Sequence, residues 1–419
     1  MKLLWLCNRV PSIIQKNING KAGTGLWTDH VLQDLRAEEK IDLRILSMSD
    51  ENTTGELDAR CSYGTFTAGA PYQYVPELET RFRRELAEFQ PDVIHIWGTE
   101  FAHSLTMVNA AEKENCLHRV VISIQGLCSV YAGHYAEGLS HRLIHSHTLR
   151  DLLRKDNIFR QQEKFACRGD LEVEALQKVS HVIGRTDWDR ACTQRINPKL
   201  TYHTCNETLR PEFYTGQWRY DQCRKHRIFA SSSAYPVKGF HYLLEAFADV
   251  LKEYPDATLA VPGTAPRSGG LRQKLRVNSY EKHLQELITR YGLEDKIEFL
   301  GGLSAQQMKE NYLAANVFAL PSTIENSPNS LGEAMLLGVP CVSSDVGGVT
   351  TMMTHNQEGY VYQSTAPYML AYYIRQVFAM ESGAEALGEN ARLHGSNTHD
   401  PQKNLRDLIG IYETIADKE

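Results

Sequence analysis

The feature that most constrains the fold of this 419-residue chain is a repeated alternation of short β-rich runs with amphipathic helical stretches. This alternation is typical of parallel sheets that are covered by helices on both faces. It occurs twice along the chain. The first set of predicted strands covers residues 2–7, 42–48, 92–98, 119–126, 181–185 and 200–205. The second set covers residues 227–233, 257–263, 296–302, 316–322, 340–345 and 359–363.

The predicted fold class is α/β, with two Rossmann-like, doubly wound domains that face a cleft. The chain is longer than one hydrophobic core usually organises. A charged, irregular stretch at residues 206–226 separates the two sets, so we expect an N-terminal domain at 1–211 and a C-terminal domain at 212–399. Residues 400–416 have a helical pattern, and the segment 400–419 is expected to return to the first domain. Ligands of such folds bind at the carboxyl ends of the strands.

Composition argues against several classes of function. The net charge is −6 and 42% of the residues are hydrophobic, so we expect no nucleic-acid partner and no general attraction to an anionic membrane. The apolar start of the chain is soon interrupted by Asn8 and Arg9, and no run approaches the ~20 apolar residues of a membrane span. The expected location is cytoplasmic. Nine cysteines are scattered singly, which indicates reduced thiols rather than disulfides or a zinc site.

Two glutamates, Glu325 and Glu333, mark the stretch between the predicted strand at 316–322 and the helix that follows it. Ser330 and Glu333 have the spacing of a capping box, in which both side chains bond to backbone amides at a helix start. This explanation accounts for Glu333 and leaves Glu325 without a role.

The same helix start also suits an anion such as a diphosphate, because the backbone amides and the helix dipole favour negative charge there. Carboxylates beside a phosphate make sense if they accept hydrogen bonds from hydroxyl groups. Glu333 would then bind a ribose diol, and Glu325 would bind hydroxyls of a sugar beyond the diphosphate. The amides expected to bind the diphosphate belong to Asn329, Ser330 and Leu331.

Lys238 with Gly239 opens the helix after the first strand of the second set. A cation at this end of a helix has the unfavourable sign unless an anion docks there. An exposed lysine whose penalty is screened by solvent is the alternative explanation. Agreement with the diphosphate inferred from the glutamates favours the anion.

The glycine-rich stretch Ala22–Gly25 fails as a dinucleotide fingerprint, because it lacks a third glycine in register and follows a long loop. The backbone of Gly23, Thr24 and Gly25 can still approach a phosphate or sugar at a helix start. Plain loop flexibility explains these glycines equally well.

Several of these stretches together resemble glycosyltransferase family 4, whose members are retaining enzymes of the GT-B fold. The resemblance rests on Glu325-x7-Glu333 with the following AMLLGVPCVSSDVGG, and on YPVKGFHYLLEAF around Lys238. The stretches PDVIHIWGTEFAHS and CNETLRPEFY extend it over nearly the whole chain.

The resemblance implies roles for individual residues and a class of substrate. It implies that Glu333 binds the ribose, that Glu325 contacts the donor sugar and that Lys238 neutralises the diphosphate. The Gly23–Gly25 loop would close on the donor. A nucleoside diphosphate sugar, with a UDP-sugar favoured, would be the co-substrate, and no other cofactor is expected. The acceptor would be a saccharide or a lipid-linked saccharide, by analogy in the synthesis of bacterial surface polysaccharide.

The sequence departs from the family pattern at two places. Many members have an arginine shortly before the lysine, where this chain has Ser231, Ser232 and Ser233, and Ser233 is expected to line the donor site. A histidine commonly ends the strand at 119–126, and Gln125 stands in its place. Gln125 would orient the sugar or the acceptor by hydrogen bonds, while the leaving phosphate oxygen takes the acceptor proton. His134 is an alternative partner in this step.

No metal ion is expected. Asp187-Trp188-Asp189 has the spacing of a metal-binding D-x-D, but it begins a helix, where acids favour the amino end. His141 and His145 share a helical face, yet their surroundings are basic and solvated. Lys238 and helix amides would neutralise the diphosphate without a metal.

Residues 142–168 form a basic, amphipathic stretch in a chain that is acidic overall. Such a segment could lie on the inner membrane surface and meet a lipid-linked acceptor, so a peripheral membrane contact is one expectation. An ordinary amphipathic helix with a solvated basic face is the alternative.

The motifs also bear on two other functions. An NAD-dependent sugar-nucleotide epimerase or dehydrogenase would need a tight glycine fingerprint and a Tyr-x-x-x-Lys pair, so the motifs favour the transferase. A non-catalytic saccharide-binding relative is the second alternative, because Gln125 and Ser231–Ser233 depart from the family pattern.

Overall fold

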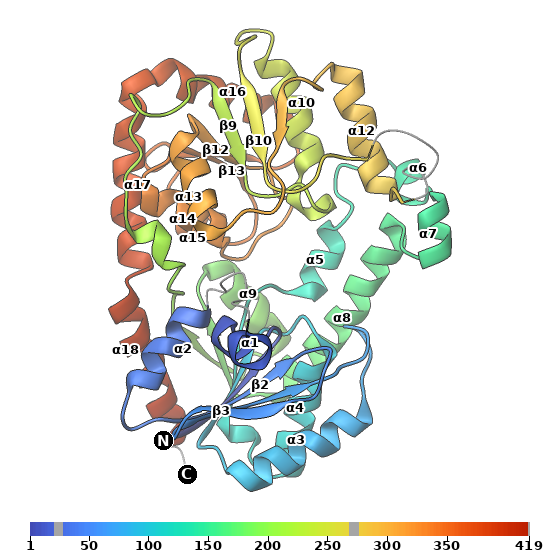
Figure 1. Ribbon diagram of the computed structural model, residues 1–419. Coiled ribbons are helices and arrows are strands. Elements are labelled where there is room, and N and C mark those ends of the chain that lie inside the picture. Colours follow the sequence, from blue (N-terminus) through green and yellow to red (C-terminus); the bar gives the residue numbers. More distant parts are fainter. Residues whose placement is uncertain (21–27, 268–275, 418–419) are drawn as a thin grey trace. The chain divides into compact units, whose positions relative to one another are not determined.

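The structure is a computed structural model that describes residues 1–20, 28–267 and 276–417 (Figure 1). The chain divides into two compact units. The first unit consists of Met1–Val130, Phe165–Arg210 and Thr398–Glu419, and the second of Tyr131–Lys164 and Pro211–Asn397. Two of these transitions lie within two residues of the boundaries expected from the sequence. The inclusion of Tyr131–Lys164 in the second unit was not indicated by the sequence.

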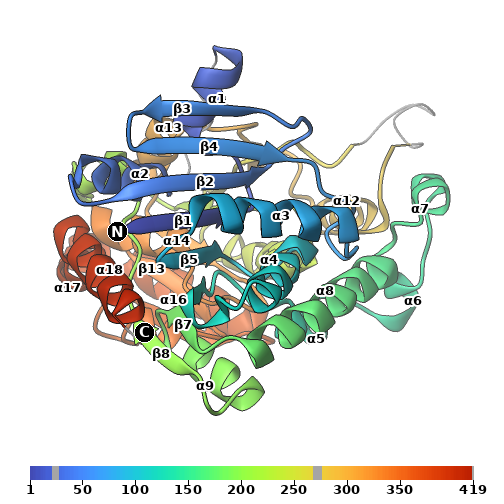
Figure 2. The ribbon, with the colours of Figure 1, turned by 90° about the horizontal axis from the view of Figure 1, so that it is seen from below.

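The first unit contains an eight-stranded sheet in the order β3-β4-β2-β1-β5-β6-β7-β8. Its strands are β1 (Lys2–Cys7), β2 (Asp42–Met48), β3 (Thr54–Asp58), β4 (Cys61–Phe66), β5 (Val93–Trp97), β6 (Val120–Ser123), β7 (His181–Gly184) and β8 (Thr201–Thr204). Neighbouring strands are parallel, except that β3 and β4 are antiparallel. Figure 2 shows β3, β4, β2, β1 and β5 as neighbouring arrows in this order.

Helices cover both faces of this sheet. One core packs α3 (Pro76–Phe89), α4 (Ala102–Lys113) and part of α8 (Ile158–Lys178) against the face that carries Leu4 and Leu6. The opposite core packs α1 (Ser12–Asn19), α2 (Thr28–Ala37) and α18 (Pro401–Ala416) against the face that carries Leu3 and Trp5. Alternate residues of β1 are therefore buried on opposite faces, as expected of a strand inside a doubly wound sheet. The remaining helices of this unit in the described residues are α9 (Asp187–Ile196) and the short 3₁₀ turn η1 (Leu117–Arg119).

The predicted helix at 400–416 is confirmed as α18, and Asp400 caps it by accepting a bond from the backbone N–H of Lys403. Tyr412 of α18 is fully buried. Its hydroxyl lies 2.6 Å from His95 Nδ1 and accepts a hydrogen bond from Trp5 Nε1 at 3.1 Å. Burial lowers the pKa of His95 to about 3, so a neutral imidazole joins α18 to β5.

The second unit contains a six-stranded parallel sheet in the order β11-β10-β9-β12-β13-β14. Its strands are β9 (Arg227–Ala230), β10 (Thr258–Val261), β11 (Ile297–Phe299), β12 (Val317–Leu320), β13 (Cys341–Asp345) and β14 (Tyr360–Gln363). The chain moves outward from β9 to β11, then returns to β12 on the other side of β9. The order therefore reverses between β9 and β12, which is the switch point where ligands of such sheets bind.

The helices of the second unit follow its strands in the order that a doubly wound fold requires (Figure 1). Among the described residues, those between and after its strands are α10 (Phe240–Val250), α12 (Ser279–Tyr291), α13 (Ala305–Ala314), α14 (Asn329–Leu337), α15 (Val349–Met352), α16 (Pro367–Met380) and α17 (Ala384–Thr398). Short 3₁₀ turns lie at η2 (Pro211–Tyr214), η3 (Pro236–Lys238) and η4 (Glu381–Gly383). Phe229, Tyr312 and Phe318 are fully buried and pack edge to face in its core.

The basic stretch at 142–168 is not one helix. It is divided among α6 (His141–Ile144), α7 (Leu149–Arg154) and the first half of α8, and α5 (Cys128–His134) precedes it. The single amphipathic helix that the sequence suggested is therefore wrong. Thr148 ends the loop before α7 and forms a capping box with Asp151, and Lys155 ends α7 with a positive φ of 49°.

The predicted fold class is confirmed: both units are α/β and doubly wound, and each of the twelve predicted strands overlaps a strand of the structure. The sequence missed β3 and β4, which extend the first sheet at one edge. Within residues 1–20, 28–267 and 276–417, no helix is long and apolar enough to cross a membrane.

Candidate functional site

Lys238 and Glu325 meet at the switch point of the second sheet. Lys238 lies in η3 after β9, and Glu325 lies in the loop after β12. Lys238 Nζ is 2.6 Å from Glu325 Oε1, although 87 residues separate the two along the chain. The sequence predicted both residues but not their pairing. The lysine at the helix start thus has an anionic partner within the protein itself.

The Glu325 carboxylate is held in place from several sides. It is only 6% exposed, and Oε1 also accepts a hydrogen bond from Ser322 Oγ at 2.7 Å. The Glu325 carbonyl accepts a bond from the backbone N–H of Gly348 at 3.1 Å. The preceding Gly347 lies so close that a Cβ atom there would overlap this carbonyl oxygen. Glu325 is therefore a positioned carboxylate rather than a mobile surface residue.

Burial alone would lower the pKa of Lys238, but the neighbouring Glu325 carboxylate outweighs burial and the pKa is raised. The ammonium therefore stays charged at neutral pH. About a quarter of its side chain, 26%, is accessible to solvent. This leaves a cation at the switch point that a ligand can reach.

Helix α14 begins at Asn329, and its first three residues are the predicted Asn329, Ser330 and Leu331. Pro328 is the residue that caps it, and no side chain accepts a capping bond there. The capping box proposed for Ser330 and Glu333 is therefore wrong, because the helix starts before Ser330. Glu333 lies one turn into α14 and is only 4% exposed. Helix capping therefore does not explain why a carboxylate occupies this buried position.

A pocket of about 480 Å³ lies at the carboxyl ends of β9, β10 and β11. The predicted Ser233 lines it together with Ser231 and Ser232. Gly263 and Gly301, which bridge β10 to the residues after β11, also line it. Lys238, Glu325 and Glu333 are not among its lining residues, so the structure does not gather every predicted residue around one pocket.

Arg267 also lines this pocket, and sequence analysis missed it. The family pattern has an arginine close to Lys238, at Ser231–Ser233, whereas Arg267 comes from the segment after β10. Its backbone N–H donates to Glu281 Oε1 at 2.9 Å, and its guanidinium lies 3.6 Å from Glu281 Oε2. No local sequence signal distinguishes Arg267 from other loop arginines.

The switch point of the first sheet has a second polar pair that sequence analysis missed. Asn8 follows β1, and its Nδ2 donates to Glu100 Oε2, after β5, at 3.0 Å. Asn8 Oδ1 in turn lies 2.8 Å from His103 Nε2. Burial raises the pKa of Glu100 to about 7, and the nearby Glu172 carboxylate acts in the same direction. The signal available in the sequence was a polar residue within a few positions of the end of each of two predicted strands.

Gln125 follows β6 in the first unit, and its Nε2 donates to Glu207 Oε1 at 2.8 Å. Arg185 Nη1 lies 2.5 Å from Glu207 Oε2, and both of these charged residues are buried. The cavity that Gln125 lines has a volume of about 30 Å³, close to that of one water molecule. This cavity cannot hold a sugar ring.

The structure resolves two other expectations. Asp187 and Asp189 begin α9, where Asp189 forms a capping box with Thr186, so their predicted helix-start role is confirmed. His134 ends α5 and lies 2.8 Å from Glu137 Oε2, while its carbonyl accepts a bond from Thr323 Oγ1. Among the described residues, no group of three or more His, Cys, Asp and Glu side chains is arranged to hold a metal ion. Gly23, Thr24 and Gly25 lie outside the described residues.

Comparison with known proteins finds a family similar to the second part of the chain. Residues 223–394 match the family described as glycosyl transferases group 1. This part of the chain is therefore similar to the group 1 glycosyl transferases. The expected kind of family is thereby confirmed, and its narrower assignment to family 4 stays a prediction.

Curated relatives match parts of the chain. Spore coat protein SA of Bacillus subtilis is 24% identical over 252 residues, which cover 58% of this chain and 65% of that protein. D-inositol 3-phosphate glycosyltransferase of Corynebacterium urealyticum is 26% identical over 180 residues, 43% of this chain and 41% of that protein. The chain thus spans less than two thirds of these relatives.

Solved structures share the fold over the whole chain. Sucrose-phosphate synthase from Thermosynechococcus elongatus has a TM-score of 0.70 at 16% identity and covers 99% of both chains. Anabaena Alr3699/HepE, solved in complex with UDP-glucose, has a TM-score of 0.67 at 17% identity and covers 99% of this chain and 100% of its own. These likenesses confirm the GT-B fold class that was predicted.

Proposed function

We propose that this chain transfers a sugar from a nucleoside diphosphate sugar to a hydroxyl group of a saccharide or lipid-linked saccharide. The observation that carries the proposal is the Lys238–Glu325 pair at the switch point of the second sheet. This sheet lies within residues 223–394, which match the group 1 glycosyl transferases. Relatives support the substrate class: one is a D-inositol 3-phosphate glycosyltransferase, and HepE was solved with UDP-glucose. A UDP-sugar is therefore the favoured donor.

Lys238 acts on the diphosphate in this proposal. An ammonium group has three N–H donors, so Lys238 can keep its contact with Glu325 and still donate to a phosphate oxygen. At the start of α14, the amides of Asn329 and Ser330 add further donors and a favourable helix dipole, whereas the Leu331 amide already donates to the Pro328 carbonyl. These groups neutralise the leaving diphosphate without a metal ion.

Glu325 acts on the donor sugar, and Glu333 on the ribose. Positive charge develops on the sugar as the bond between its anomeric carbon and the phosphate oxygen breaks, and a buried carboxylate stabilises that charge. The acceptor oxygen then bonds to the face of the anomeric carbon that the phosphate leaves, and the acceptor proton passes to the leaving phosphate oxygen. The configuration of the anomeric carbon is therefore retained. Gln125 is fixed by Glu207, and the cavity that it lines is too small for a sugar ring, so it is assigned no contact with the sugar.

The biological setting is part of the proposal. We place the protein in the cytoplasm, in the synthesis of bacterial surface polysaccharide, with peripheral membrane contact through residues 142–168. The basic and partly exposed helices of this segment support that contact.

The test compares Glu325→Gln with Glu333→Gln after a mass-spectrometric screen of sugar nucleotides has found the donor. Glu325→Gln is expected to lower turnover about 100-fold and to leave the affinity for the free nucleotide nearly unchanged, because the lost charge acts on the transition state. Glu333→Gln is expected to weaken binding of the free nucleotide and of the donor alike by ~1.5–3 kcal/mol, because each contains the ribose. Turnover is measured with a chelator present, since the mechanism needs no metal.

Glu310→Gln, an exposed glutamate of α13, is the matched control and should change neither quantity. Melting temperatures of all variants separate activity from stability. Full activity in both site variants would exclude the assigned roles. A wild-type protein that neither transfers nor hydrolyses any donor of the panel would instead support the saccharide-binding alternative.

A further inference from the structure

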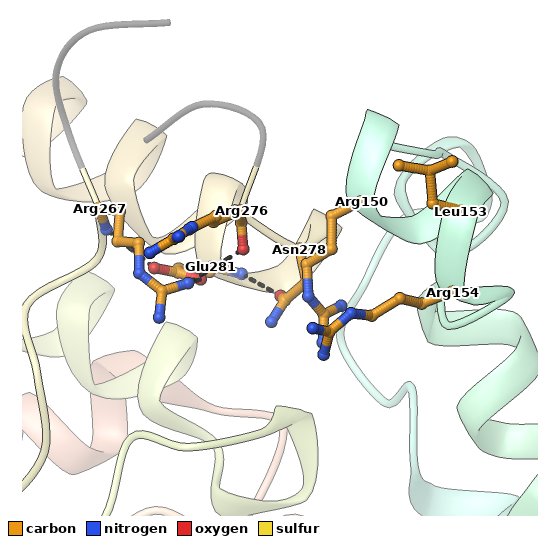
Figure 3. Close-up of a pocket in the computed structure, with 7 residues that line it drawn as sticks. All are labelled: Arg150, Leu153, Arg154, Arg267, Arg276, Asn278 and Glu281. Atoms are coloured by element: carbon orange, nitrogen blue, oxygen red, sulfur yellow. Dashed lines mark hydrogen bonds and ion pairs between the residues drawn. The ribbon is translucent and has the colours of Figure 1, made fainter. Parts of the chain in front are cut away.

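Four arginines line one pocket of about 650 Å³ in the second unit. Arg150 and Arg154 come from α7, whereas Arg267 and Arg276 come from the segment between β10 and α12. Figure 3 shows the side chains of Arg150 and Arg154 reaching from α7 towards the start of α12. More than a hundred residues separate the two pairs in sequence, so no sequence motif could reveal the pocket. The other lining residues are Leu153, Asn278 and Glu281.

A buried contact fixes the two halves of this arginine pocket to each other. Asp151 of α7 is completely buried, and its Oδ2 accepts a bond from the backbone N–H of Ser279, the first residue of α12, at 2.9 Å. The Ser279 hydroxyl also donates to Asp151, and it lies 3.2 Å from the carbonyl oxygen of Ser146. A fully desolvated carboxylate that is bonded in this way is a firm anchor. The fold therefore holds the elements that carry the arginines close to one another.

The positive charge of the pocket is only partly neutralised. Arg150 is paired with Asp151 and Asp156, and Arg267 lies beside Glu281. For Arg154 and Arg276, no ion pair is found within the described ranges, and both residues are exposed. Like charges that converge in a concave site raise the local potential and attract anions. Guanidinium groups match phosphoryl oxygens in geometry as well as charge.

We propose that the arginine pocket binds a ligand with a multiply charged phosphoryl group, distinct from the donor diphosphate assigned to Lys238. The arginine pocket adjoins the pocket of about 480 Å³, and Arg267, Asn278 and Glu281 line both. The volume of the arginine pocket lies in the range of small-molecule sites. The phosphoryl group has two sources that fit the surroundings. One is a soluble phosphorylated molecule. The other is a lipid headgroup, because Leu149, Leu152 and Leu153 of α7 are 58%, 59% and 84% exposed around the same short helix.

The first experiment measures binding of inorganic pyrophosphate by calorimetry, with UDP present to occupy the proposed donor site. Arg154→Ala and Arg276→Ala are each expected to weaken binding about tenfold, and the double variant more, because each removes a charge-assisted contact. Arg142→Ala is the matched control: it is an exposed arginine of α6 that does not line the pocket, and it should bind as the wild type does. Substituting an exposed arginine should leave the core intact, and the melting temperature of every variant checks this.

The second experiment distinguishes the source by flotation with vesicles of phosphatidylcholine, with and without phosphatidylglycerol. A lipid source predicts that the protein floats only with the anionic vesicles, and that Leu153→Ser weakens this without changing pyrophosphate affinity. A soluble source predicts pyrophosphate binding and no flotation. The proposal is overturned if the wild type binds neither probe, or if Lys238→Ala abolishes pyrophosphate binding while the arginine variants retain it. That last result would leave the proposed transferase function standing.

Discussion

The switch points of the two sheets occupy equivalent places in the topology but differ in chemistry. In the first sheet the loops after β1 and β5 bring together Asn8 and Glu100, and in the second the loops after β9 and β12 bring together Lys238 and Glu325. Both pairs therefore sit where doubly wound sheets bind ligands. One carboxylate has a neutral amide as its partner, and the other has a cation.

The difference in partner decides the charge of each site. Beside Lys238, the Glu325 carboxylate raises the pKa of the ammonium, so the lysine stays charged and can also receive an anion. Beside Asn8 the Glu100 carboxyl has a pKa of about 7, so near neutral pH it exists in both forms and can donate or accept a hydrogen bond. The second switch point thus suits a phosphate, and the first suits uncharged hydroxyl groups.

The largest expected effect is a loss of stability when the glycine at each switch point is replaced by alanine. A Cβ atom at Gly239, where φ is 62°, would overlap the backbone carbonyl oxygen of Pro321. A Cβ at Gly98, where φ is 96°, would instead meet the side chains of Glu100 and Asn8, which can move aside. We expect Gly239→Ala to destabilise by ~2–4 kcal/mol and Gly98→Ala by about half as much. Denaturant unfolding measures both, and an equal loss would mean that the second loop is as adaptable as the first.

An intermediate effect is expected at the charged pair. Lys238→Ala should weaken binding of a nucleoside diphosphate by ~1.5–3 kcal/mol, because it removes the cation assigned to the phosphates. Lys252→Ala is the control, since this lysine is 78% exposed and pairs only with Asp249 among the described residues. Calorimetry with UDP gives both affinities. Equal affinity in the two variants would remove the charged character that distinguishes the second switch point.

The smallest effect is expected at Glu100 and depends on pH. Its pKa is about 7 in the folded protein and ~4.3 in an unfolded chain, so the folded state binds more protons between these values. The Glu100 carboxyl therefore stabilises less as pH rises from about 4.3 to 7. Glu100→Gln resembles the neutral form, so its stability relative to wild type should grow by ~1–2 kcal/mol across this window.

Unfolding of wild type and Glu100→Gln at several pH values from 5 to ~8 provides the measurement. Each other titrating group contributes equally to both curves, so only their difference reports on Glu100. Parallel curves would show that Glu100 titrates normally, and the contrast between the two switch points would then rest on Lys238 alone.

Sequence reasoning worked best where local pattern determines structure. Each predicted strand is a short apolar run bounded by turn residues, and the helix at 400–416 has both an amphipathic stripe and a capping Asp400. The edge strands β3 and β4 were missed because their sequences, TGELD and CSYGTF, contain glycine and little apolar alternation. Their structure depends on the pairing of β4 with β2 and of β3 with β4 rather than on their own propensity.

By itself the sequence determined the α/β class, the two sheets and the loop positions of Lys238, Glu325 and Asn329, because periodicity and helix-start signals act over a few residues. Only the tertiary structure decided that Lys238 pairs with Glu325, since that contact joins residues 87 positions apart. It also decided that Arg154 and Arg276 line one pocket. That pocket exists because a buried Asp151 joins α7 to Ser279, and the choice of a long-range partner depends on packing and desolvation that no local pattern encodes.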